Sequence, residues 1–306
     1  MMNISFIASN TLHELATFLE KLNNIREHHV GFCGEKGSEI KATLERDFSD
    51  IGVSKSFIVG YDGMEIKGAV GLDVDTKEES AEVWGPFVDE DDPEMWLNTA
   101  TILWQQLIDS LTVPVSTFQF FINQHNVNAK KFILKLNGME KGDHDILTCD
   151  RTQFYPPLNH DVRLFTNNHT QSFKKLHDSL FPQTYYDAEE ILKKINEPTN
   201  KLLIVEKEQI VIGYAYVEVE PEHGEGQIEY IGIAPDYRRQ GLATQLLTNA
   251  LHVLFSYPTV EDITLCVSKQ NTKAIRLYQA AGFKKERQLT YFELNVDGLD
   301  NRRGRG

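Results

Sequence analysis

The segment Ile228–Ala243 reads I-E-Y-I-G-I-A-P-D-Y-R-R-Q-G-L-A and joins an apolar strand to a helix through a short basic turn. The small residues Gly241 and Ala243 stand where the helix opens, just after Arg238 and Arg239. The first N–H groups of a helix lack partners within the helix and lie at the positive end of its dipole. Small residues let an anion approach these groups, and arginines add positive charge. The segment therefore predicts a phosphate-binding turn.

The spacing of this turn separates it from two common nucleotide-binding motifs. Neither the Walker pattern G-x-x-x-x-G-K-[ST] nor the dinucleotide fingerprint G-x-G-x-x-G occurs in the segment. Instead it reads R-x-x-G-x-A, with Arg238, Gly241 and Ala243 at the fixed positions. This spacing resembles the pyrophosphate loop of the GNAT superfamily, the acyl-CoA-dependent N-acyltransferases. On this motif alone, an ordinary strand-to-helix turn that happens to be basic stays open as the alternative.

A second motif, Asn271–Phe283, reads N-T-K-A-I-R-L-Y-Q-A-A-G-F. It predicts a helix that opens with an Asn cap and ends before Gly282, with one apolar face and Tyr278 at the edge of that face. It resembles the N-x-x-A-x-x-L-Y-x-x-x-G-F segment of the same superfamily. The resemblance implies that Asn271 lies near the pantetheine arm of CoA and that the Tyr278 hydroxyl lies near the thioester sulfur.

Composition bounds the class of protein. With 306 residues the chain exceeds the usual size of one domain, and its 41% hydrophobic residues include no run of membrane-spanning length. We expect no membrane association, and the N-terminus lacks a signal-peptide pattern, so we expect a cytoplasmic location. A net charge of −14 argues against nucleic-acid binding. The three cysteines, Cys33, Cys149 and Cys266, form no metal-ligand pattern, so no metal is expected.

The second half of the chain shows a definite order of elements. Periodicity and turn residues predict strands at Val162–Phe165, Lys201–Val205, Val211–Glu220, Gln227–Ile233, Ile263–Val267 and Gln288–Leu294, and helices at His169–Leu180, Ala188–Ile195, Gln240–Phe255 and after Asn271. The order of strand, two helices, three strands, helix, strand, helix and strand is that of the superfamily that the motifs resemble.

The first half repeats this order more faintly. Strands are expected at Ser5–Ala8, Phe57–Gly60, Ile66–Asp73, Ala81–Val88 and Val115–Ile122, and helices at Leu12–Leu22, Ile40–Phe48, Met95–Leu107 and Val127–Leu136. The segment A-E-V-W-G-P-F-V aligns with I-E-Y-I-G-I-A-P, because Glu229 minus Glu82 and Gly232 minus Gly85 both give 147. The halves are therefore interpreted as tandem copies, and an unrelated α/β domain in the first half is the alternative.

The copies differ where the phosphate turn would lie. At the same offset Arg238 corresponds to Asp91 and Gly241 to Glu94, within an acidic segment D-E-D-D-P-E. A like-charge pair at ~6 Å and an effective dielectric constant of ~20 costs about 2 to 3 kcal/mol, which exceeds the attraction of a helix terminus. The position of Tyr278 falls on Ile133 or Leu134, so the first half has no equivalent hydroxyl. We expect a degenerate first domain that binds no cofactor.

These observations predict a mixed α/β fold of two tandem GNAT-like domains, each with a mostly antiparallel central sheet flanked by helices. The expected boundaries are residues 1–150 for the degenerate domain, 151–160 for a linker, 161–300 for the catalytic domain and 301–306 for a flexible tail.

The resemblance implies an N-acetyltransferase that uses acetyl-CoA as cosubstrate. An alkylamine of pKa ~10.4 is neutral only about once in 2,500 molecules at pH 7, so a base is needed. Several carboxylates lie close in sequence, and Glu229 is preferred because it sits inside the strand before the phosphate turn. Tyr278 is the expected proton donor to the departing thiolate. Cys266 is expected to be buried and inert.

The remaining site residues follow from the same resemblance. Acetyl-CoA is expected to contact the strand end and the turn, with Ile231, Gly232, Ile233, Arg238, Arg239, Gln240, Gly241, Leu242, Ala243, Thr244 and Asn271. Phe181, Tyr185 and Tyr186 lie in the helix–helix region that lines the acceptor cleft in the family, and are the expected acceptor contacts. The partner is a small-molecule or peptide amine. Its identity, the length of the acyl chain and the oligomeric state, with a homodimer among the options, stay open.

A second class of function also stays open, namely a module that senses acyl-CoA without turnover. Such a module needs only the turn from Arg238 to Thr244, whereas an enzyme also needs Tyr278 and a base. The presence of Tyr278 favours the enzyme.

Overall fold

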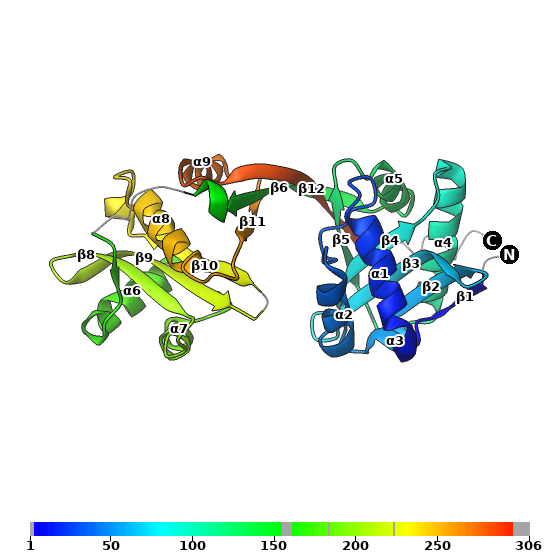
Figure 1. Cartoon of the computed structure of the whole chain (residues 1–306), viewed down its shortest axis with the longest axis horizontal. Coiled ribbons are helices and arrows are strands. Elements are labelled where there is room, and N and C mark those ends of the chain that lie inside the picture. The colour runs from blue at the N-terminus through cyan, green and yellow to red at the C-terminus, as the bar shows by residue number, and fades with distance from the viewer. Residues whose placement is uncertain (1–2, 155–160, 183, 223, 296–306) are drawn as a thin grey trace. The chain divides into compact units, whose positions relative to one another are not determined.

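The computed structural model describes residues 3–154, 161–182, 184–222 and 224–295 of the chain, and these residues form two compact units. The described part of the first unit comprises residues 3–144 and 287–295, and the second unit comprises residues 145–286. Figure 1 shows that each unit combines strands with flanking helices. The predicted mixed α/β fold with mostly antiparallel pairing is confirmed.

The first unit is built on a sheet with strand order β1-β2-β3-β4-β5-β12, in which β12 is Lys284–Asn295. Every pair is antiparallel except β4 and β5, which are parallel over three residue pairs. Its elements are β1 (Asn3–Phe6), α1 (Leu12–Asn23), α2 (Gly37–Arg46), α3 (Val53–Ser56), β2 (Phe57–Asp62), β3 (Glu65–Asp75), β4 (Ser80–Val88), α4 (Pro93–Asp109), β5 (Thr117–Asn123), α5 (Val127–Lys135) and the first part of β6 (Met139–Asp150).

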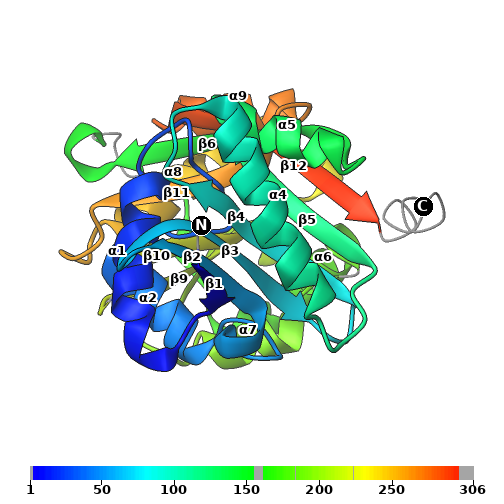
Figure 2. The ribbon, with the colours of Figure 1, turned by 90° about the vertical axis from the view of Figure 1, so that its right-hand side faces the viewer.

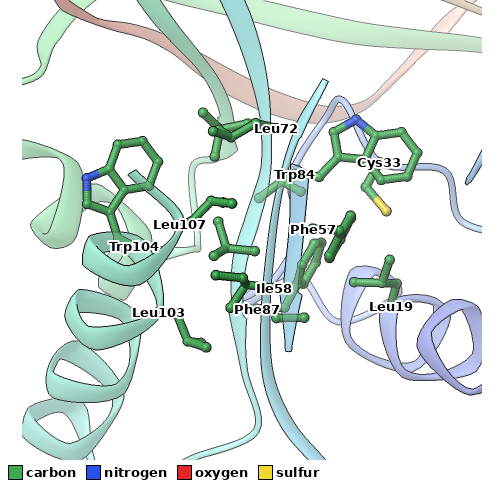
Figure 3. Close-up of a cluster of buried hydrophobic side chains, with 14 of the residues drawn as sticks. Leu19, Cys33, Phe57, Ile58, Leu72, Trp84, Phe87, Leu103, Trp104 and Leu107 are labelled. Atoms are coloured by element: carbon green, nitrogen blue, oxygen red, sulfur yellow. The ribbon is translucent and has the colours of Figure 1, made fainter. Parts of the chain in front are cut away.

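Helices cover both faces of this sheet, and the core lies on either side of it. Figures 2 and 3 show α4 on one face, with Leu103, Trp104 and Leu107 pointing at the strands, and Leu19 of α1 on the opposite face. These side chains are buried, as is Phe57 of β2 between the two layers. Helical spacing in α4 gathers its apolar residues on one side, which is why this helix packs flat against the sheet.

The second unit contains a four-stranded antiparallel sheet with strand order β10-β9-β8-β7. Its elements are β7 (Arg163–Leu164), α6 (Thr170–Leu180), α7 (Ala188–Lys194), β8 (Lys201–Lys207), β9 (Ile210–Glu220), β10 (Glu225–Ile233), α8 (Leu242–Leu254), β11 (Asp262–Ser268) and α9 (Thr272–Ala280). Alternation along β9 sends Ala215 and Val217 into the α8 cluster, and sends Tyr214 and Tyr216 into the cluster with α6 and α7.

The two units exchange their last strands, which the sequence did not predict. β12 (Lys284–Asn295) follows α9 along the chain, yet its residues Leu289–Asn295 pair with β5 in the first unit. In return, residues 145–150 of β6 follow the elements of the first unit, yet belong to the second unit, whose β11 is next to β6 in strand order. A strand pattern shows which face is buried but not which edge the strand joins, since any sheet edge offers the same backbone groups.

The compact units do not coincide with the predicted boundaries at residues 150 and 161–300. The compact units break after residues 144 and 286 instead. Of the predicted linker, Arg151 is part of the second unit, where its Nε donates to the Val260 carbonyl at 2.9 Å. The rest of the linker from residue 155, and the predicted tail 301–306, lie outside the described residues.

All the predicted helices and strands are present, with ends that shift by a few residues. Among the α-helices and strands of the described residues, the short helix α3 and the strand β6 were not predicted. None of the helices in the described residues is both long and apolar enough to span a bilayer.

Candidate acetyl-CoA and amine site

The turn between β10 and α8 has a special backbone conformation at two residues. Arg239 has φ of +64° and Gly241 has φ of +80°, both in the left-handed region. A side chain added at Gly241 would meet no atom within 4 Å, so the conformation, and not crowding, favours glycine there. The turn thereby brings the chain from the strand directly onto the first turn of α8.

The first turn of α8 has free N–H donors. Gly241 is the N-cap and offers no side-chain acceptor, and Gln245 is the first residue whose N–H bonds back within the helix, to the Gly241 carbonyl at 3.1 Å. Helix geometry therefore leaves the N–H groups of Leu242, Ala243 and Thr244 without helical partners. The exposed side chains of Arg238 and Arg239 lie in the same turn. The predicted anion-binding features are thus brought together.

The equivalent helix of the first unit has no such free end. Asp92 is the N-cap of α4, and its carboxylate accepts from the N–H groups of Glu94 and Met95, both at 2.9 Å. Pro93, the first residue of α4, has no N–H. The positive end of α4 is therefore already satisfied by the chain's own carboxylate.

β10 presents an open edge beside the turn. It is the outer strand of its sheet, and β11 is paired in a different ladder. The Ala234 N–H donates to the Ile212 carbonyl at 2.8 Å. Because backbone groups alternate along a strand, those of Ile231 and Ile233 point away from β9. Arg238 confirms this direction, because its Nε donates to the Ile233 carbonyl at 3.1 Å. This edge can pair with an extended ligand that carries amide groups.

In the first unit a segment of the chain pairs with β5 beyond the point where β4 stops doing so. β4 pairs with β5 only from Ser80 to Glu82, and beyond that point Val30 bridges to Ile122 of β5. The Gly31 N–H donates to the Phe121 carbonyl at 2.6 Å, and the Asn123 N–H donates to the His29 carbonyl at 3.2 Å. Val30 is fully buried. The part of β5 that β4 leaves unpaired is therefore occupied by the chain itself.

A β-bulge shapes the acceptor side of the second unit. The register of β10 against β9 shifts between Ile228 and Tyr230, which leaves Glu229 as the extra residue. Tyr230 packs against the α6 and α7 cluster, and burial followed by the charge of Glu218 raises the pKa of Glu229. Glu229 makes no hydrogen bond or salt bridge to any residue that the structure describes. It is a half-buried carboxylate with a raised proton affinity.

Glu218, a neighbouring carboxylate, is fully engaged. Its Oε1 accepts from the Tyr216 hydroxyl at 2.6 Å and lies 3.0 Å from the Lys194 Nζ. That Nζ also lies 4.5 Å from the centre of the Tyr186 ring. The alternation of Tyr216 and Glu218 along β9 places both on the face covered by α7.

Two of the three predicted acceptor contacts are held in place by hydrogen bonds or ring packing. The Tyr186 N–H donates to the Tyr230 hydroxyl at 3.1 Å, and the His177 Nε2 donates to the Tyr186 carbonyl at 3.0 Å. The Phe181 ring lies 5.2 Å from the Tyr230 ring. Tyr185 is 84% exposed, and its ring is tilted against that of Tyr186 with 4.6 Å between the ring centres.

Lys194, His177 and Tyr230 were not singled out from the sequence. The alternation of β9 and β10 could have placed the tyrosines on one face, but the bulge at Glu229, which shifts that alternation, has no sequence signature here.

The second motif helix matches its predicted geometry. The Asn271 side chain caps α9 by accepting from the Ala274 N–H at 3.2 Å. The Tyr278 ring packs edge-on against Phe283 at 5.5 Å, and burial raises the pKa of its hydroxyl. That hydroxyl has no hydrogen-bond partner among the described residues. A protonated, unengaged phenol can donate a proton to a developing anion.

Cys266 is exposed, so the prediction that it is buried is wrong. The odd-numbered neighbours Ile263 and Val267 point into the core instead. Partial desolvation and the charge of Asp145 nevertheless raise the pKa of the thiol, which disfavours the reactive thiolate.

An open cavity of about 690 Å³ adjoins the phosphate turn on its β8 side. Four carboxylates and two basic side chains contribute to its wall, and one of those carboxylates, Glu206, is already paired with Arg163 and His169. A phosphate is therefore favoured at the α8 terminus and not in this cavity. The lining residues are Asp161, Arg163, Val205, Glu206, Lys207, Glu208, Ile212, Asp236, Tyr237, Gln240 and Leu242.

The comparison with protein families decides the assignment of this half. Residues 168–283 match the Acetyltransferase (GNAT) family. Residues 168–283 belong to the GNAT family. The matched segment contains both motifs and all of the predicted site residues.

Two curated relatives of the GNAT half are acetyltransferases by name. The chain is 32% identical over 96 residues to the "N-terminal acetyltransferase B complex catalytic subunit NAA20" of Arabidopsis thaliana, covering 30% of this chain and 55% of that protein. It is 30% identical over 107 residues to "Spermidine N(1)-acetyltransferase" of Escherichia coli K12, covering 35% and 56%. The chain thus spans little more than half the length of these relatives.

The fold of the whole chain is similar to that of a solved tandem GNAT protein from the clavulanic acid biosynthesis pathway. The TM-score is 0.64 at 13% identity, and the match covers 97% of this chain and 99% of that one. The prediction of a tandem GNAT arrangement is confirmed at the level of the fold.

Proposed function

We propose that the second unit is an acetyl-CoA-dependent N-acetyltransferase that acts on a primary amine of a small molecule or peptide. The observation that carries the proposal is the uncapped start of α8, with two arginines in its turn, beside the open edge of β10. The two curated relatives support an amine as acceptor, since one is named for protein N-termini and the other for spermidine.

The residues present suit the two polar parts of CoA. The N–H groups of Leu242, Ala243 and Thr244 would hold the diphosphate, with Arg238, Arg239 and Gln240 at its side. The outward backbone groups of Ile231 and Ile233 would pair with the pantetheine amides, and Asn271 lies in the second motif for the same arm. When bound, acetyl-CoA supplies an activated acetyl thioester.

Glu229 is the best candidate for the base. Glu218 is bound to Lys194 and Tyr216, and Glu220, Glu222 and Glu225 are exposed. Glu229 is half-buried and has no ion pair among the described residues, so its raised pKa suits it to accept a proton from an ammonium ion. Tyr278 would protonate the leaving sulfur. Phe181 and Tyr186, with the exposed Tyr185, would line the acceptor side.

The first unit would bind no acetyl-CoA. Asp92 satisfies the start of α4, and the segment around Val30 occupies the edge of β5. We therefore place a single catalytic site in the chain.

The alternative, a sensor that binds acyl-CoA without turnover, is less well supported, because it gives no role to the unengaged hydroxyl of Tyr278 or to Glu229.

Release of free CoA, measured with acetyl-CoA as donor across a panel of amines, tests the proposal. We expect release that depends on the amine and saturates with it. Saturable binding of acetyl-CoA without amine-dependent release would support the sensor instead. The absence of both acetyl-CoA binding and CoA release would contradict both assignments.

A further inference from the structure

The ammonium group of Lys194 is held by two different groups. Its Nζ lies 3.0 Å from Oε1 and 3.2 Å from Oε2 of Glu218, and 4.5 Å from the centre of the Tyr186 ring. A carboxylate together with an aromatic face is the combination that binds alkylammonium ions in proteins. The end of α7 thus shows an ammonium site that is filled by a residue of the chain itself.

Other contacts than Lys194 hold the Glu218 carboxylate and the Tyr186 residue in position. The hydroxyl of Tyr216, a fully buried residue, donates to Glu218 at 2.6 Å. The backbone of Tyr186 is held on both sides, by the Tyr230 hydroxyl and by the His177 Nε2. The carboxylate and the ring would therefore keep their arrangement if Lys194 left.

Lys194 is suited to leave. It is the last residue of α7, and its side chain is 34% exposed, against 20% for Glu218. A partly exposed lysine–carboxylate pair is a weak interaction, and a flexible four-carbon stem can swing into solvent at low cost. Another alkylammonium ion can take the place of the lysine.

The site lies beside the proposed base. Glu229 is the bulged residue between Ile228, which pairs with Val217, and Tyr230, which pairs with Tyr216, so it lies opposite the β9 residues next to Glu218. The charge of Glu218 acts on Glu229, and both charges act on the Tyr216 hydroxyl. With Lys194 in place, its charge and those of the Glu218 and Glu229 carboxylates sum to −1. With Lys194 displaced, the two carboxylates leave a net charge of −2. An acceptor that brings two amino groups can occupy both carboxylates.

We propose that the Glu218 carboxylate and the Tyr186 ring form a subsite for a second, charged amino group of the acceptor, and that Lys194 fills this subsite until the acceptor displaces it. The inference rests on the proposed function, because the reacting amine is placed at Glu229. It names the acceptor class: a compound with two amino groups, of which one reacts as the neutral amine and the other binds as an ammonium ion.

Calorimetric binding of n-butylammonium to the full chain, without acetyl-CoA, tests the subsite apart from turnover. Lys194→Met removes the competing charge but keeps a stem of similar size. We expect it to bind the probe at least about tenfold more tightly than the native protein, and we expect the double variant Glu218→Gln with Lys194→Met to lose that gain. Lys174→Met is the matched control, because Lys174 forms an ion pair of 2.8 Å with Glu189. It should bind as the native protein does.

Equal affinity of the native protein and Lys194→Met would overturn the inference, as would a gain that survives Glu218→Gln. Thermal unfolding shows whether each variant is folded. Should Lys194→Met not fold, Lys194→Gln replaces it with the same expectation.

Turnover separates this inference from the proposed function. We expect 1,4-diaminobutane to have a KM at least about tenfold below that of n-butylamine, and Glu218→Gln to remove the difference. Acetylation of both amines with equal KM would overturn the subsite while the proposed function stands. Acetylation of no amine would contradict the proposed function, and the binding of n-butylammonium would still decide the subsite.

Discussion

At the scale of single residues, the two units carry the same carboxylate in different surroundings. Glu82 of β4 and Glu229 of β10 stand 147 residues apart in the aligned sequence segments of the two halves. Burial, followed by the charge of Asp73, raises the pKa of Glu82 to about 6, and burial followed by Glu218 raises that of Glu229. In the second unit we propose that this carboxylate, Glu229, acts as the base. In the first it only weakens the fold at neutral pH.

Glu82→Gln should stabilise the first unit above about pH 6. A raised pKa means that the folded state binds the proton more tightly, so this group favours folding below its ordinary pKa of 4.5 and loses that contribution as the pH rises through about 6. The shift corresponds to about 2 kcal/mol, and partial exposure reduces the expected gain to about 1 kcal/mol. Denaturant unfolding at pH 4.5 and pH 8, followed by tryptophan fluorescence, measures it. A gain of equal size at both pH values would contradict this explanation.

Tyr278→Phe should lower kcat by about 10²-fold, because it removes only the proton proposed for the leaving thiolate. Binding of acetyl-CoA, measured by calorimetry, should stay nearly unchanged since the ring and its contact with Phe283 remain. Tyr257→Phe is a suitable control, because that hydroxyl only bonds the Pro198 carbonyl at 3.3 Å. Native kcat in the Tyr278 variant would remove the acid role.

At the scale of elements, the starts of α4 and α8 show how one residue changes what a helix terminus can bind. Asp92 supplies the carboxylate that satisfies α4, whereas Gly241 leaves the N–H groups of α8 open. The same dipole is used to stabilise the helix in one unit and is available for a ligand in the other.

Gly241→Asp should give α8 a capping carboxylate like that of Asp92 in α4, and should weaken the binding of CoA. Asp and Asn tolerate the left-handed backbone at φ of +80° about equally, so Gly241→Asn is the matched neutral control. We expect the Asp variant to bind CoA at least about tenfold more weakly than the Asn variant, because a carboxylate repels the diphosphate by about 2 to 3 kcal/mol at ~6 Å. Calorimetric titration with CoA measures the difference. Equal affinities in the two variants would place the diphosphate elsewhere.

At the scale of the whole molecule, the first unit is built from two separate stretches of chain, whereas the second unit is one continuous stretch. The first unit needs β12, whose Phe292 and Leu294 are fully buried in its core. The second unit takes residues 145–150 of β6. Boundaries drawn from sequence at residues 150 and 161 would therefore give each half the wrong last strand.

A chain of residues 1–286 should not form a stable first unit. It lacks β12, and losing two large core side chains costs about 2 to 5 kcal/mol each, out of a typical total stability of about 5 to 15 kcal/mol. All three tryptophans, Trp84, Trp96 and Trp104, lie in the first unit, so their fluorescence reports its unfolding. We expect the cooperative transition of the full chain to be lost. The same midpoint in both chains would show that β12 is dispensable.

Local patterns in the sequence determined the helices, the strands, their order and the two motifs of the second half. Helix caps, periodicity and left-handed glycines depend on residues a few positions apart. A short segment of sequence is therefore enough to predict them. R-R-Q-G-L-A and the Asn271 cap are in this class, and the structure has both as expected.

Only the tertiary structure decided which strands exchange between the units and that the segment around Val30 pairs with β5. It alone also placed the bulge at Glu229, and Lys194 against Glu218 and Tyr186. Each of these depends on a partner distant in the chain or on a shift of register. Backbone edges and long charged side chains accept many partners at similar energy, so the choice is made by the packing of the whole molecule and not by the residues that take part.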